Sequence, residues 1–507
     1  MKDRVSRRSF HMLAAAAILP FLLQGNALPA ADWRFEVRYP KETRAEPYTG
    51  RVYVFFSRNR EEPRTGPGWI QPDPFIARDV RDWQPGEPLV FDAARGNELL
   101  AFPVPLAEMS LAGHRAQAVV RFDADERTVG TGPGNGFSAV RTLPVAPQAG
   151  AAIALTVDRI VPEPEFRETR WTKRLEVESK LLSDFHGRPV KLRAAIALPA
   201  SYHDRPKRRY PTIFEIPGFG GTHFSAIRNE PVAERNARGV EFLRVTLDPS
   251  CPLGHHVFAD SANNGPFGRA LVEELLPAFE ARFRGIAEPT ARFLTGHSSG
   301  GWSSLWVQIT HPETFGGVWS TAPDPVDFRD FQRIDLYADR ANMHFEPNGE
   351  PRPLARVRGR VVIRYRDFDR MEHVLGHGGQ LHSFEAVFSP RGADGRPVRL
   401  WSRETGAVDP AVAEMWKKYD IRLVLEENWP TLGPQLAGKL HVITGGEDTF
   451  YLEGAVRQLK KSLADLGSDA VVEIVPGKDH SNVLSPELVE RIRAEMTAAF
   501  LKRHEWE

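Results

Sequence analysis

The chain has 507 residues, of which 41% are hydrophobic and 26% are charged. This length allows two or three domains, and this composition is typical of a folded globular protein rather than a disordered chain. Lys and Arg together (66) equal Asp and Glu together (66). No basic excess therefore points to nucleic acid or to a membrane surface, and we expect neither as a partner.

The first 30 residues have the pattern of an export signal. Arg7 and Arg8 precede an apolar run over residues 12–23, and small residues follow the run. Such a segment is typically removed after export, and the adjacent arginines resemble a twin-arginine signal. The run is too short to span a membrane comfortably. We expect residues 1–30 to direct export to the periplasm or out of a bacterium, with no stable membrane insertion afterwards. An uncleaved membrane anchor and a chance arginine pair are the alternatives.

Residues 32–161 carry the signals of short strands. Segment 115–122 alternates between apolar and polar side chains, and segments 51–57 and 153–157 are rich in Val, Ile, Leu, Phe and Tyr. Turn residues such as Gly and Pro separate these segments, which predicts a small all-β domain of the Ig-like sandwich type. The domain contains no catalytic motif, so we expect it to pack on the rest of the chain. A role in substrate binding is the alternative.

After a Pro/Glu-rich linker at 161–165, strand and helix patterns alternate over residues 172–507. A hairpin is expected first, from segments 173–181 and 190–198 with a turn at Gly187. This alternation predicts a mostly parallel sheet with helices on both faces, as in an α/β domain. The expected strands lie at 211–216, 241–247, 292–295, 317–320, 439–444 and 471–475, and the expected helices at 267–283, 302–309, 451–466 and 487–501.

A G-x-S-x-G motif places Ser298 between an expected strand and an expected helix. The motif alone is short and weak, but a strand–turn–helix context is where a nucleophile elbow must lie. The elbow strains the serine backbone, and small neighbours such as Gly296 and Gly300 avoid clashes there. Ser298 is therefore the candidate nucleophile.

A serine hydroxyl needs a base to remove its proton, and the base needs an acid to orient it. His480 follows the last expected strand and is the candidate base. Asp448 follows the preceding strand and is the candidate acid, with Glu447 beside it as the alternative. The order Ser, Asp, His along the chain is the order of α/β-hydrolases.

The oxyanion of an acyl-transfer reaction needs two backbone N–H donors. Ser299, directly after the nucleophile, supplies the first candidate donor. Phe219, in a glycine-rich loop after strand 211–216, supplies the second, although a simple tight turn is the alternative for this loop. Trp302 beside the motif and Asp324 after strand 317–320 are candidate substrate-pocket residues.

Four segments together resemble the putative-esterase branch of the α/β-hydrolases, which includes feruloyl-esterase-like, esterase-D-like and enterochelin-esterase-like enzymes. The resemblance covers roughly residues 173–322 and 436–503. It implies an α/β-hydrolase fold and hydrolysis of carboxylic esters without a cofactor or a metal. The segments are Pro217-Gly218-Phe219-Gly220-Gly221, Asp260-Ser261 with Asn264-Gly265-Pro266, Gly296-His297-Ser298-Ser299-Gly300-Gly301 and Asp479-His480-Ser481.

Between about 324 and 435 the chain is longer than a simple member of this branch, and we expect a cap-like insertion over the site. Three histidines, His373, His377 and His382, lie close together there. Two histidines four apart on a helix could bind a metal, but the glycines among them disfavour a helix. We therefore expect hydrogen-bonding histidines rather than a metal site.

These features predict an exported serine hydrolase that cleaves carboxylic esters through an acyl-enzyme intermediate. Its expected partner is a small-molecule or carbohydrate-linked ester, and feruloyl, acetyl, siderophore and short acyl esters all fit. A serine peptidase, an acyltransferase and an inactive binding protein on the same fold are the alternatives. The pattern does not define the oligomeric state.

Overall fold

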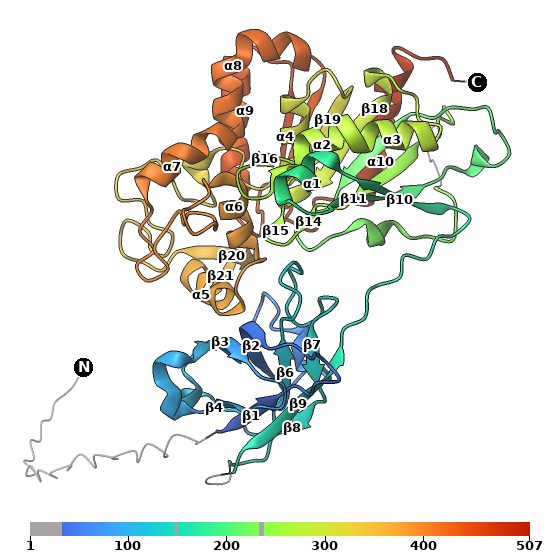
Figure 1. The fold of residues 1–507 in the computed structure, drawn as a ribbon. Coiled ribbons are helices and arrows are strands. Elements are labelled where there is room, and N and C mark those ends of the chain that lie inside the picture. The colour runs from blue at the N-terminus through green and yellow to red at the C-terminus, as the bar shows by residue number, and fades with distance from the viewer. Residues whose placement is uncertain (1–32, 148–150, 233–237, 507) are drawn as a thin grey trace, which may run out of the picture.

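The computed structural model describes residues 33–147, 151–232 and 238–506, so the predicted export signal in residues 1–30 lies outside the described part. An all-β part and a larger α/β part are joined by an extended segment (Figure 1). None of the helices in the described ranges is long and apolar enough to cross a membrane.

The all-β part is one curled sheet of nine strands within the described residues. Its longest path runs β4-β1-β9-β7-β6-β2-β3-β5, and β8 pairs with β6. The first half of β9 pairs in parallel with β1, and its second half pairs antiparallel with β7. The predicted all-β domain is confirmed, and β9 joins the two expected sandwich layers into one sheet. The strands are β1 Phe35–Arg38, β2 Tyr48–Ser57, β3 Phe75–Trp83, β4 Leu89–Phe91, β5 Leu100–Phe102, β6 Arg115–Val120, β7 Gly136–Ser138, β8 Arg141–Thr142 and β9 Ile153–Ile160.

From Val52 onwards, strand β2 is buried on both faces, because the all-β part packs on the α/β part. Successive side chains of a strand point to opposite faces. Val52, Val54 and Phe56 belong to the all-β part's own core. Tyr53 and Phe55 belong instead to the large core cluster that continues through the α/β part. The two parts therefore share apolar packing.

Within the described residues, the sheet of the α/β part has eight strands in the order β10-β11-β13-β12-β18-β19-β22-β23. Pairings β10–β11 and β11–β13 are antiparallel, and the others are parallel. This confirms the predicted mostly parallel sheet of an α/β-hydrolase. The strands are β10 Thr172–Glu178, β11 Lys191–Ala197, β12 Thr212–Ile216, β13 Leu243–Leu247, β18 Arg292–His297, β19 Gly317–Thr321, β22 Leu440–Gly445 and β23 Val471–Val475.

The predicted hairpin pairs as expected, but helix α1 (Lys180–His186) lies in its connection. The Ser179 hydroxyl accepts the N–H of Leu182, and Gly187 has a φ of 66°. A serine N-cap and a left-handed glycine just beyond the last turn are strong helix boundaries. These local caps therefore end strand β10 earlier than its apolar pattern suggests.

Helices cover both faces of the sheet (Figure 1). On one face, Phe293 and Trp319 pack in a cluster with residues of α10. On the other face, Phe214 contacts Phe279 of α3 at a ring-centroid distance of 5.5 Å. The helices are α2 Phe267–Ala270, α3 Leu276–Arg282, α4 Ser299–Thr310, α9 Glu453–Asp465 and α10 Pro486–Leu501, and short ribbons are formed by β14 Ser250–Cys251, β15 Gly254–His255, β16 Asp260–Ser261 and β17 Gly265–Pro266.

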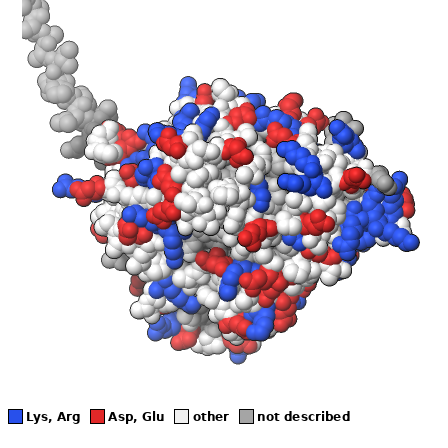
Figure 2. Space-filling view, turned by 90° about the horizontal axis from the view of Figure 1, so that it is seen from above, with Lys and Arg blue, Asp and Glu red and all other residues white. Residues whose placement is uncertain are grey.

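The segment between β19 and β22 forms a substructure of its own, and α5 lies beside the all-β part (Figure 1). Basic and acidic side chains are interspersed over the face in Figure 2, apart from a group of Lys and Arg at one edge. The elements of this segment are β20 Pro353–Val357, β21 Arg360–Arg364, α5 Tyr365–Leu375, α6 Gln380–Phe388, α7 Pro410–Trp416 and α8 Ile421–Leu436.

Candidate active site

Ser298 lies on the sharp turn between β18 and α4. Its backbone has φ 59° and ψ −128°, a region that residues other than glycine rarely adopt. A Cβ at Gly296 would overlap the Gly300 carbonyl, and a Cβ at Gly300 would overlap the Ile216 carbonyl. The Ser298 N–H donates to Thr321 O of β19 at 3.1 Å. Close packing by glycine thus holds Ser298 in the strained conformation expected of a nucleophile elbow.

The structure brings Asp448 and His480 together from the ends of neighbouring strands. His480 Nδ1 lies 2.8 Å from Asp448 Oδ2, and the other carboxylate oxygen accepts the N–H of Phe450 at 2.8 Å. Asp448 is fully buried, whereas Glu447 is exposed. The carboxylate that contacts the imidazole is therefore that of Asp448 and not that of Glu447.

The pKa values of two histidines at the site are shifted in opposite directions. Burial lowers the pKa of His480, but the hydrogen bond and charge of Asp448, with smaller effects of Asp324 and Asp479, outweigh burial and raise it. The ring of His297 lies 4.6 Å from the ring of His480, and burial followed by the charge of His480 lowers the pKa of His297 to about 4. Of these two histidines, His480 is the one that hydrogen-bonds to the buried carboxylate of Asp448, and this bond stabilises its protonated form.

Ser298 and His480 line one cavity of about 340 Å³. Phe219 also lines it, and a Cβ at Gly218 would lie 3.3 Å from Ser298 Cβ, so the glycine-rich loop approaches the nucleophile closely. Ser299 is the first residue of α4, where backbone N–H groups have no partner within the helix. The other lining residues are Trp69, Gly218, His297, Asp324, Gln332, Leu354, Phe368, Gln380, Leu381, Phe450 and Ser481.

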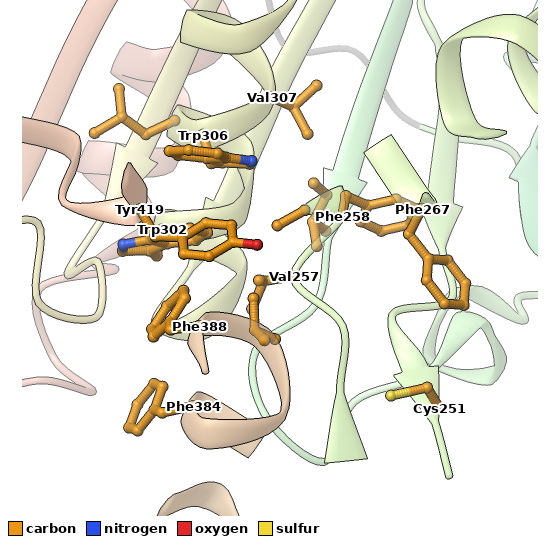
Figure 3. Packing of buried hydrophobic residues seen from close by; sticks show 14 of the residues in the cluster. Cys251, Val257, Phe258, Phe267, Trp302, Trp306, Val307, Phe384, Phe388 and Tyr419 are labelled. Carbon is orange, nitrogen blue, oxygen red and sulfur yellow. The ribbon is translucent and has the colours of Figure 1, made fainter. Parts of the chain in front are cut away.

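Of the two predicted pocket residues, only Asp324 is part of this wall. Its carboxylate accepts bonds from Ser299 Oγ at 2.6 Å and Gln380 Nε2 at 3.3 Å, and burial raises its pKa to about 6. Trp302 is 1% exposed and is not among the described residues that line the cavity. Helix α4 directs it into the core, where it stacks on Trp306 at 5.2 Å and contacts Phe388 (Figure 3).

Sequence reasoning missed the residues that two other parts of the chain supply. Trp69 comes from the loop before β3 in the all-β part, and Phe368 and Gln380 come from α5 and α6. An apolar Trp-Ile pair between Pro67 and Pro72 was the one available signal for the loop. A loop that exposes two large apolar residues often marks a binding surface.

The three clustered histidines do not share one helix, because α5 ends at Leu375 and α6 begins at Gln380. His382 Nδ1 lies 2.9 Å from Gly376 O, and His377 Nε2 lies 3.1 Å from Ala124 O. Over the described ranges, no three His, Cys, Asp or Glu side chains are grouped so that they could hold a metal ion.

A family model described as Putative esterase matches residues 187–490. The match spans more than half of the chain and includes Ser298, Asp448 and His480. The chain belongs to the Putative esterase family. The all-β part, which includes Trp69, precedes the matched segment.

Solved structures similar to this chain share little sequence with it. An S-formylglutathione hydrolase from Agrobacterium tumefaciens is 13% identical, with a TM-score of 0.37, over 66% of this chain and 95% of that one. A ferulic acid esterase from Anaeromyces mucronatus is 14% identical, with a TM-score of 0.36, over 64% and 91%. A dipeptidyl peptidase 4 from Porphyromonas gingivalis is 12% identical, with a TM-score of 0.38, over 85% and 49%. No curated protein matches the chain.

Proposed function

We propose that this member of the Putative esterase family is an exported serine hydrolase that cleaves carboxylic esters. Ser298 is the nucleophile, His480 is the general base, and Asp448 orients the imidazole. The observation that carries the proposal is the buried 2.8 Å contact between His480 and Asp448 at a cavity that Ser298 also lines. The strained backbone of Ser298 and the family membership support it.

The first half of the reaction forms an acyl-enzyme. Ser298 Oγ attacks the ester carbonyl while His480 Nε2 takes the hydroxyl proton. The N–H groups of Ser299 and Phe219 stabilise the oxyanion of the tetrahedral intermediate. When this intermediate collapses, the C–O bond to the alcohol breaks, and His480 returns the proton to the leaving alkoxide oxygen.

The second half frees the acid. A water molecule gives a proton to His480 as its oxygen attacks the acyl carbonyl, and the same N–H groups stabilise the new oxyanion. The bond to Ser298 Oγ then breaks, and His480 reprotonates the serine. Asp448 stays ionised and stabilises the imidazolium that forms in each half. Its 2.8 Å contact to Nδ1 leaves Nε2 as the nitrogen that serves the reaction.

The expected substrate is a small-molecule or carbohydrate-linked ester. The cavity of about 340 Å³ is at the small end of ligand sites and holds one acyl or alcohol group of modest size. Its wall combines aromatic side chains with the polar side chains of Asp324, Gln332 and Gln380. This composition suits an ester with one apolar group and a few hydrogen-bonding groups.

The test is covalent labelling of the chain without residues 1–30 by a fluorophosphonate, together with hydrolysis of nitrophenyl acetate and butyrate. Ser298→Ala should abolish both signals. Ser110→Ala is the control serine variant, since Ser110 is exposed and is not among the described residues that line the cavity, and it should keep both signals. Label or turnover that persists in Ser298→Ala would overturn the assignment, and a parent without either would indicate an inactive binding protein.

Export has its own test in a bacterial host. The twin-arginine proposal expects the mature chain in the periplasmic fraction, with a new N-terminus near residue 31. Replacing Arg7 and Arg8 by lysines should keep the full-length precursor in the cytoplasm. A double variant that is exported and cleaved like the parent would remove the twin-arginine proposal and leave esterase activity untouched.

A further inference from the structure

A loop of the all-β part places Trp69 on the wall of the cavity that contains Ser298. The Trp69 ring lies 5.1 Å from the ring of Phe368 and 5.9 Å from the rings of Phe219 and Phe450. Centroid distances between 4.5 and 7 Å are typical of direct aromatic contact. Four rings from four separate segments thus form one aromatic wall beside the candidate nucleophile.

The base of this loop is anchored, while its tip is open. The Asp73 N–H donates to Pro67 O at 3.0 Å, and the Asp73 carboxylate accepts bonds from Arg60 Nε and Ser57 Oγ. Trp69 itself remains 37% exposed. The ring is therefore held by its neighbours on one side and keeps apolar surface free on the other.

Contacts at the end of α5 fix the all-β part against the insertion. The carbonyls of His373 and Val374 accept bonds from Arg51 Nη1 at 2.8 and 3.0 Å, and the carbonyl of Leu375 accepts a bond from Tyr53 Oη at 2.6 Å. The last carbonyls of a helix have no partner within it, and a cation near them is favourable. The all-β part thus caps the helix that carries Phe368.

A second set of contacts joins the all-β part to the loop after α5. Arg121 Nη1 donates to His377 O at 3.0 Å, and the Arg127 guanidinium lies 5.7 Å from the centroid of the Phe219 ring. Gly378 packs so closely that an added Cβ would collide with the Arg127 backbone. These contacts specify one docked arrangement, and that arrangement sets where Trp69 lies relative to Ser298.

We propose that the all-β part completes the substrate site, and that Trp69 is a specificity-determining residue that selects esters with a planar apolar ring. The inference rests on the proposed esterase function. A ring can stack on Trp69 or meet it edge-on, whereas a flexible alkyl chain of equal size gains contact area without this geometric preference. An anchored aromatic wall also costs little conformational entropy when a ligand binds.

The experiment compares the full exported chain with Trp69→Ala, Trp69→Phe and Ile70→Ala. Ile70 is the matched control, because it lies on the same loop with 54% exposure and is not among the described residues that line the cavity. Two substrate pairs, each matched in carbon number, place the ring on either side of the ester: methyl 3-phenylpropanoate against methyl nonanoate, and benzyl acetate against heptyl acetate. Acid release measured by titration gives kcat/KM for each.

We expect Trp69→Ala to lower kcat/KM about tenfold for the ring-bearing ester of one pair, with less than about a twofold change for its alkyl partner. The pair that responds shows whether Trp69 meets the acyl or the alcohol group. Trp69→Phe should keep most of the preference for a ring, and Ile70→Ala should match the parent. Ile70→Ala should melt like the parent, because Ile70 is 54% exposed. Trp69→Ala loses contacts with three rings, so its melting curve is used to set an assay temperature at which it is fully folded.

Two failures remain distinguishable. A parent that labels with fluorophosphonate and hydrolyses esters, but whose preference for a ring survives in Trp69→Ala, overturns the role of Trp69 and leaves the esterase intact. Equal losses on the ring-bearing and alkyl esters also overturn it. A parent that neither labels nor hydrolyses any of the four esters overturns the proposed function and, with it, this inference.

Discussion

The contact between Asp448 and His480 offers a substitution that keeps shape and removes charge. In the structure, Asp448 Oδ1 accepts the Phe450 N–H, and Oδ2 lies 2.8 Å from His480 Nδ1. In Asp448→Asn only the amide oxygen can accept from Phe450, so the amide NH₂ must face His480. Nδ1 then has to act as an acceptor, and the imidazole proton moves to Nε2. The nitrogen that should take the proton of Ser298 is already protonated.

The size of the effect follows from the burial of the pair. The side chain of His480 is 10% exposed and that of Asp448 is 0% exposed. Removing one partner of a buried ion pair costs roughly 3–5 kcal/mol, because the other charge stays buried without its counter-charge. The imidazolium exists in the transition state of the proposed reaction, so this cost corresponds to a loss of roughly 10²- to 10⁴-fold in kcat.

The pH profile adds a second measurement with a definite sign. His480 must be neutral to act as a base, and its pKa is raised, so kcat/KM of the parent should fall as pH drops through a value above the ordinary histidine pKa. Asp448→Asn removes the charge that raises this pKa, so the acid limb should move to lower pH.

The assay is nitrophenyl ester hydrolysis from about pH 5 to about pH 9 for the parent, Asp448→Asn and Glu447→Gln. Glu447 is the matched control, since it is the adjacent carboxylate and is exposed. The reasoning is refuted if Asp448→Asn keeps more than about a tenth of kcat with an unshifted acid limb. It is equally refuted if Glu447→Gln produces the loss.

Three further substitutions test the surroundings of the site. Gly218→Ala places a Cβ 3.0 Å from His297 O and 3.3 Å from Ser298 Cβ, so the loop of Phe219 must move. The kcat on nitrophenyl esters should fall about 10²-fold with little change in KM. An unchanged kcat contradicts the oxyanion role of Phe219. Asp324→Asn removes a charge that raises the pKa of His480, so the acid limb of kcat/KM should move to lower pH, and movement to higher pH contradicts this. Glu372 accepts the N–H groups of Leu381 and His382 at the start of α6, and burial raises its pKa from 4.5 to about 7. The fold therefore favours the protonated carboxyl, and the free energy of unfolding of the parent should fall as pH rises from about 4.5 to about 7. Urea titrations should show a fall of about 3 kcal/mol relative to Glu372→Gln. Equal pH dependence in both proteins contradicts the raised pKa of Glu372.

The α/β sheet and the residues after its strands could be predicted because their signals are local. An apolar strand followed by G-x-S-x-G predicts the turn that holds Ser298. Parallel strands end at the same edge of a sheet, so the residues that follow β22 and β23 converge there. The 2.8 Å contact between Asp448 and His480 is a consequence of that convergence.

Long-range pairing and competing local signals were harder to predict. The alternation of side chains in β9 predicts a strand. It does not indicate that β9 pairs with β1 through one half and with β7 through the other. Residues 180–186 carry apolar side chains that suit either a strand or a helix. The caps at Ser179 and Gly187 decide in favour of the helix.

The wall of the cavity depends on tertiary docking, which proximity in sequence does not reveal. Trp302 is four residues from Ser298, yet α4 turns it into the core. Trp69 is far from Ser298 in sequence and lies outside the family match at 187–490, yet it lines the cavity. The contacts of Arg51 and Tyr53 with α5 hold these distant parts together. If Trp69 selects the substrate, the choice among esters depends on a segment that the family match does not cover. Family membership then predicts the type of reaction more closely than it predicts which ester is cleaved.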